Sequence, residues 1–226
     1  KMNVLSDIDI KPQNGDALAV GIGKEEIHLL YQAMRDDVTG IERVGLFYAH
    51  GVISQTPFNF QAPAGDDASM PEMMVVEHKG EDVLVAAWIQ GTGRSAEVIS
   101  VVQDSIWSVE EYSNISSPGA TKVVMMHVSD DEIKVYHDEI GSLGPVTRYG
   151  MYNVGDSEIS LSNLIAEGHV VGAGSIGADA IVIMSSPSGQ ISAKKIANIN
   201  PNTGDDDDGG ILDYILSPLP GDSQKD

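Results

Sequence analysis

The 226-residue sequence contains no cysteine, and this absence excludes several kinds of chemistry. Without thiols the chain forms no disulfide, no thiolate metal site and no cysteine nucleophile. The absence fits a cytosolic protein and equally fits many secreted ones. No apolar run approaches the roughly 18 residues of a membrane-spanning helix. Residues 1–7 lack the features of a signal peptide. Because the chain opens on Lys1, we interpret it as a processed or excised piece.

Basic residues are scarce. The chain has 13 lysines and arginines against 34 acidic residues, and its formal net charge is −21. Such a surface repels phosphate backbones and anionic lipids, so we expect neither a nucleic-acid partner nor membrane insertion. It keeps a protein soluble and attracts divalent cations or basic partners. Its simplest interpretation is an extracellular, cell-surface or high-salt habitat.

What the sequence does contain is an acidic corner followed by a hydrophobic strand, and this pattern occurs four times. The clearest copy is the stretch 81–88, EDVLVAAW. Aligning the acidic residues Glu25, Glu81, Asp131 and Asp179 places Ile27, Val83, Ile133 and Ile181 in one column, and Leu29, Val85, Val135 and Ile183 in the next. The intervals of 56, 50 and 48 residues are typical of propellers, solenoids or arrays.

Each repeat contains four short strands separated by clusters of Gly, Pro, Asp and Ser. The repeats occupy about residues 16–66, 69–117, 118–167 and 168–217, with an extra strand at 3–10 and a tail at 218–226. Such units predict an all-β, β-propeller-like fold with about four tandem four-stranded antiparallel blades. The alternative is a pair of β-sandwiches. Residues 24–34 would suit a helix, but their alignment with the other repeats favours a strand. Residues 1–226 are therefore predicted to form one propeller or a segment of a larger one.

The stretch 96–108 resembles a hairpin of sialidase-like, Asp-box β-propellers. Ser100 and Trp107 keep the spacing of that motif, whereas Val102 stands in place of its Asp and Asp104 in place of its Gly. Membership would imply a sugar-processing or sugar-binding propeller. The catalytic family uses three arginines and an Arg-Ile-Pro segment; this sequence has four arginines in all and no Arg-Ile-Pro. We therefore transfer no catalytic residue, and the sequence favours a non-enzymatic role.

In a propeller, the loops between second and third strands and those between blades lie on one face. Here these loops carry the predicted ligand-binding residues: Arg35, Asp36, Asp37, Asp66, Asp67, Arg94, His137, Asp138 and Glu139. Arg35 and Arg94, in equivalent loops, suit bidentate recognition of a carboxylate. The alternative is that these side chains are ordinary solvated charges. The six histidines show no close pairing typical of a metal site.

A run of four aspartates lies between the last two strands of the fourth repeat: Asp205, Asp206, Asp207 and Asp208. Clustered carboxylates beside Gly209 and Gly210 suit calcium, which takes six to eight oxygen ligands. The spacing is not that of an EF-hand loop, and a solvated acidic loop is the alternative interpretation.

Three functions remain open at this point. The first is a secreted or cell-surface propeller that binds a glycan or protein partner through the loops of one face, without catalysis. The second is a segment of a sialidase-like glycoside hydrolase, whose further blades would belong to a longer parent chain. The third is a structural repeat module of a surface assembly.

Overall fold

The computed structural model describes residues 18–24, 26–36, 42–52, 59–61, 68–102, 113–114, 118–156, 158–160, 163–176, 179–196 and 212–215. All regular structure in this part of the chain is β-strand. The strands are β1 (Leu18–Ile22), β2 (Glu26–Asp36), β3 (Glu42–Val52), β4 (Asn59–Gln61), β5 (Ser69–His78), β6 (Glu81–Gln90), β7 (Ser95–Val102), β8 (Ser113–Asn114), β9 (Val123–Ser129), β10 (Glu132–Gly141), β11 (Gly144–Asn153), β12 (Glu158–Ile159), β13 (Asn163–Glu167), β14 (His169–Ile176), β15 (Asp179–Ser185), β16 (Ile191–Ile196) and β17 (Leu212–Ile215). Among the described residues, no helix is long and apolar enough to cross a membrane.

The strands form four antiparallel sheets, each a meander of strands that are consecutive in the chain. The orders are β1-β2-β3-β4, β5-β6-β7-β8, β9-β10-β11-β12 and β14-β15-β16-β17. In the third sheet β13 also pairs with β11, beside the stretch that β12 leaves unpaired. This local connectivity follows from the short turns in the sequence, because antiparallel neighbours need only a tight hairpin.

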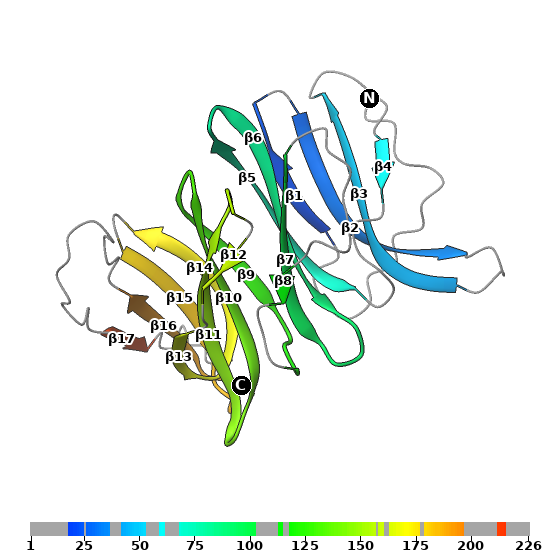
Figure 1. Cartoon of the computed structure of the whole chain (residues 1–226). Helices are drawn as coiled ribbons and strands as arrows, with labels where there is room; N and C mark the ends of the chain where they lie inside the picture. The colour runs from blue at the N-terminus through cyan, green and yellow to red at the C-terminus, as the bar shows by residue number, and fades with distance from the viewer. Residues whose placement is uncertain are drawn as a thin grey trace, which may run out of the picture.

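The sheets pack face to face in chain order, first on second, second on third and third on fourth. Figure 1 shows the first and fourth sheets at opposite ends of this row. Each middle sheet therefore buries both of its faces, which two separate sandwiches would not require. The predicted all-β, propeller-like fold is confirmed, and residues 24–34 contribute a strand rather than a helix. The predicted strand at 3–10 and the tail at 218–226 lie outside the described residues.

Three apolar layers hold the row together. Trp88, fully buried, fills the first layer with Leu30 and Leu84. The second layer joins Val83 and Val85 to Ile133 and Val135, and the third includes Tyr136, Val182 and Met184. Burying an aliphatic side chain of this size stabilises a protein by about 1.5–3 kcal/mol. The layers therefore fix how consecutive sheets sit on one another.

The structure corrects the alignment of the acidic corners. The second strand of each sheet begins at an acidic residue, and these residues are Glu26, Glu81, Glu132 and Asp179. The predicted columns were thus one residue out of step in the first and third repeats. Val83 and Ile133 are not equivalent: they lie on opposite faces of their own sheets and meet in the same layer. A shift of one residue moves a side chain to the other face of a strand.

Candidate functional site

Arg94 lies in the tight turn between β6 and β7, and it holds the segment that leads into β9. Its backbone has a positive φ of 56°, and its carbonyl accepts a hydrogen bond from the Ala120 amide at 2.8 Å. Its guanidinium donates from Nε to the Ala120 carbonyl at 2.8 Å and from a terminal nitrogen to the Thr121 carbonyl at 3.4 Å. We call Pro118–Lys122 the β9 linker. The predicted ligand-binding Arg94 thus also has a structural role.

Asp138 lies near the end of β10, and its carboxylate is almost completely buried, with 1% of the side chain exposed. One oxygen accepts hydrogen bonds from the amides of Thr121, at 2.6 Å, and Lys122, at 3.0 Å. The other accepts from the Thr121 hydroxyl and from His169 Nδ1, the latter at 2.6 Å. A buried carboxylate needs such partners, because desolvation otherwise penalises its charge. Asp138 is therefore the centre of a hydrogen-bonded cluster.

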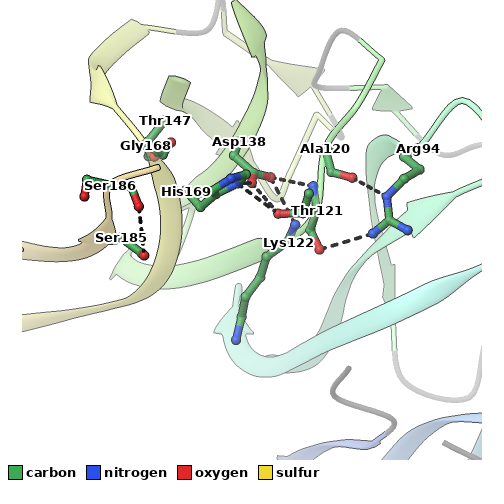
Figure 2. Close-up of polar contacts among 10 residues, drawn as sticks. All are labelled: Arg94, Ala120, Thr121, Lys122, Asp138, Thr147, Gly168, His169, Ser185 and Ser186. Carbon is green, nitrogen blue, oxygen red and sulfur yellow. Dashed lines mark hydrogen bonds and ion pairs between the residues drawn. The ribbon is translucent and has the colours of Figure 1, made fainter. Parts of the chain in front are cut away.

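His169 is the first residue of β14, so its bond to Asp138 joins the third sheet to the fourth. A carboxylate only accepts hydrogen bonds, so Nδ1 carries the proton and Nε2 is left as the second polar atom of the ring. His169 is 40% exposed, and Nε2 has no hydrogen-bond partner among the described residues. Figure 2 shows Asp138, Thr121 and His169 converging, with Arg94 on the opposite side of the β9 linker. The cluster presents an oriented imidazole to solvent.

The sequence predicted that His137 and Glu139 lie in a loop. They lie in β10 instead, because this strand continues to Gly141. Side chains alternate along a strand, so His137 and Glu139 lie on the face opposite Asp138. His137 is fully buried, and burial lowers its pKa below the ordinary value. Glu139 is also largely buried and forms an ion pair with Arg148. Neither side chain is presented at the surface beside His169.

The remaining predicted site residues are described in part or not at all. Arg35 and Asp36 are the last residues of β2, and they pair across the sheet with Arg43 and Glu42. The structure describes their backbone and not their side chains. Asp37, Asp66, Asp67, Asp205, Asp206, Asp207 and Asp208 lie outside the described residues. In the part of the chain that is described, no group of three or more His, Asp or Glu side chains is arranged to hold a metal ion.

Sequence reasoning missed Thr121, Lys122 and His169 as members of the site. His169 is 31 residues from Asp138 and belongs to another sheet, so no local spacing connects them. The one available signal was position: the β9 linker lies in the connection between the second and third repeats, and His169 begins the first strand of the fourth. The structure brings two predicted residues, Arg94 and Asp138, together through this linker.

No protein-family model matches this sequence, and no curated protein sequence does. Solved structures do match in fold. An acylaminoacyl peptidase in complex with Z-Gly-Gly-Phe-chloromethyl ketone gives a TM-score of 0.51 at 9% identity, covering 88% of this chain and 33% of that one. The Pyrococcus horikoshii acylaminoacyl peptidase gives 0.50 at 8% identity, over 88% and 32%. A GH62 hydrolase in complex with xylotriose gives 0.48 at 8% identity, over 89% and 71%.

These likenesses concern the fold alone, since the identities are 8–9%. The chain spans about a third of the length of the two peptidases it matches. The sialidase-like resemblance of the stretch 96–108 stays a prediction: Ser100 lies in β7, and Trp107 lies outside the described residues.

Proposed function

We propose that this chain is a secreted or cell-surface binding module that recognises a glycan. The glycan binds at the end of the sheets where the β9 linker and His169 lie, with His169 as a contact residue. The observation that carries the proposal is the buried carboxylate of Asp138, which fixes an exposed imidazole. Sugar hydroxyls both donate and accept hydrogen bonds, so a fixed Nε2 offers them a directed partner. Because four hydrogen bonds hold Asp138, the imidazole is oriented before a ligand arrives, which lowers the entropic cost of binding.

The described part of the cluster favours binding over glycoside hydrolysis. Most glycoside hydrolases use a pair of carboxyl groups on either side of the scissile bond. The cluster contains one carboxylate, Asp138, and both of its oxygens already accept hydrogen bonds. The hydroxyl of Ser185, which pairs with His169 across β14 and β15, donates to the Ser186 carbonyl at 3.3 Å. His169 Nδ1 lies 2.6 Å from the Asp138 carboxylate and 3.3 Å from the Thr121 hydroxyl, and that hydroxyl itself donates to Asp138.

A glycan array tests this function, with wild type compared with His169→Gln. The exposed His127 in β9 supplies the matched control His127→Gln, because it is an exposed histidine outside the cluster. We expect wild type and His127→Gln to bind the same glycans. We expect His169→Gln to bind about 3- to 10-fold more weakly, the value of one hydrogen bond. Binding of no glycan by the folded wild type, or equal binding by His169→Gln, would contradict the proposal.

Calcium binding by the run 205–208 is a separate proposal that rests on the sequence. A calcium ion bound to the native state raises the melting temperature by mass action. We expect a calcium-dependent rise for wild type and none after replacement of Asp205, Asp206, Asp207 and Asp208 by Asn. Magnesium serves as the control ion, because it demands a smaller octahedral site. Equal shifts for wild type and variant would remove the proposal.

A further inference from the structure

Each sheet has a leading face, toward the preceding sheet, and a trailing face, toward the following one. The second sheet defines both: Met73, Val75 and Leu84 pack on the first sheet, whereas Val83 and Val85 pack on the third. Positions in each second strand are counted from the acidic residue that begins it. In the third and fourth sheets, as in the second, odd-numbered steps from that residue lie on the leading face and even-numbered steps on the trailing face. Equivalent positions can therefore be compared between the sheets at the two ends of the row.

The contact between the first and second sheets includes a gap at Gly21 of β1, where a side chain is missing. We call this gap the glycine notch. On the trailing face of β1, a Cβ added at Gly21 would lie 3.0 Å from Val75 Cγ2 and 3.2 Å from Met73 Cγ. Met73 and Val75, on the leading face of β5, thus occupy the space that a larger residue at position 21 would fill. The absence of a side chain at Gly21 lets β1 and β5, the first strands of these two sheets, approach one another.

The leading face of the first sheet carries equivalents of these two side chains, and no other described sheet packs over them. Val20 pairs with Leu29 as Val75 pairs with Leu84, and Leu18 pairs with Tyr31 as Met73 pairs with Ala86. Leu18 and Val20 are 51% and 49% exposed, and the neighbouring Ile22 is 70% exposed. We call Leu18, Val20 and Ile22 the apolar row of β1. Such a row of exposed apolar side chains on one strand is unusual for a surface that remains in water.

The trailing face of the fourth sheet carries the matching notch. Gly174 pairs with Ile181 and Gly172 with Ile183, which are the positions of Gly21 and Ala19 in the first sheet. A Cβ at Gly172 or Gly174 would meet nothing within 4 Å. Within one molecule the notch belongs to β14 of the fourth sheet and the apolar row to β1 of the first, and Figure 1 shows these two sheets at opposite ends of the row.

We propose that a second copy of this chain docks head to tail, with Leu18 and Val20 of one copy seated against Gly172 and Gly174 of the other. This contact repeats the packing between consecutive sheets. The leading face of the first sheet of one copy meets the trailing face of the fourth sheet of the other, as a leading face meets a trailing face within one chain. Such a heterologous contact gives a closed ring if the rotation closes and an open chain if it does not. With a net charge of −21 on each copy, repulsion opposes docking at low salt and is screened at high salt.

Sedimentation equilibrium over a range of protein concentrations tests this proposal, in low salt and in about 1 M salt, where the Debye length is about 3 Å. We expect the wild-type chain to reach at least twice the mass of a single chain, more readily at high salt. We expect Val20→Lys and Gly174→Leu each to remain monomeric under the same conditions. Val20 is half exposed and a Cβ added at Gly174 would meet nothing within 4 Å, so neither change disturbs the core of a single copy.

Mixing the two variants provides the decisive arm. Val20→Lys keeps its notch and Gly174→Leu keeps its apolar row, so a head-to-tail contact predicts a one-to-one dimer in the mixture. The matched control Leu143→Lys, at a residue 89% exposed in the β10–β11 turn, should associate as wild type does. A strictly monomeric wild type overturns the proposal, whether the face stays bare or another part of the same chain covers it. Association that neither variant weakens, or a mixture that stays monomeric, also overturns it.

Discussion

Replacing Asp138 by Asn is the most informative single change, because the carboxylate receives four hydrogen bonds from two segments. Asn keeps one oxygen, which can still accept from the Thr121 and Lys122 amides. Its amide group then faces the Thr121 hydroxyl and His169 Nδ1, where the carboxylate accepted two further bonds. A hydrogen bond to a charged group is worth about 1.5–3 kcal/mol. His169 is 40% exposed and can bond to water instead, which reduces the loss.

We therefore expect Asp138→Asn to lower the free energy of unfolding by about 2–4 kcal/mol. Urea denaturation measures this, and a chain of this size should lose about 2–4 °C of melting temperature per kcal/mol. The matched control is Asp156→Asn, at an exposed residue in the turn after β11, which should change stability by less than about 0.5 kcal/mol. A double-mutant cycle with His169→Gln should give a coupling energy above about 0.5 kcal/mol. Equal stability of the two Asn variants would refute the reasoning.

Three further predictions concern glycine geometry, a buried histidine and the first core layer. Gly168→Ala should cost more than about 1 kcal/mol, because φ is +120° and the new Cβ would lie 2.6 Å from the Ser185 carbonyl oxygen; urea denaturation beside Gly93→Ala, in open space, is the check. Burial lowers the pKa of His137, so the unfolded state binds more protons and stability should fall as pH drops below about 6.5, by at most about 1.4 kcal/mol per pH unit. His137→Gln should reduce this dependence of stability on pH. If the dependence is unchanged in the variant, other titrating groups cause it. Trp88→Ala should cost about 3–5 kcal/mol in the same assay, since the indole is fully buried between the first two sheets; a loss below 1 kcal/mol, on the order of a surface change, would show that this layer contributes little.

The fold class could be predicted because its information is local. Short alternating strands between turn residues give meanders of neighbouring strands, and the repeat of about 50 residues gives several similar sheets. The face on which each side chain lies was predicted less well. The second strand begins at Glu26 in the first sheet and, after the turn Asp130–Asp131, at Glu132 in the third, one residue later than the alignment of acidic corners placed it. Ile133 and Val135 therefore lie on the face of their sheet opposite to the one that Val83 and Val85 occupy in theirs.

The candidate site could be predicted only in part. Loop position pointed to Arg94 and Asp138, and the structure joins them through the β9 linker. It also places His137 inside the protein, since β10 extends three residues beyond Asp138. Where a strand ends depends on its partner: Asp138 and Glu139 pair with Thr147 and Val146 of β11, and that pairing continues to Gly141.

The sequence by itself determined that the chain is all-β, repetitive and strongly acidic, because periodicity and composition are properties of neighbouring residues. Only the tertiary structure decided that Asp138 and His169 meet, since they belong to different sheets. It also decided that Leu18 and Val20 are exposed while their equivalents Met73 and Val75 are packed. The physical reason is the same in both cases. A strand pattern fixes which side chains share a face, whereas the partner of that face depends on which sheet is packed against it.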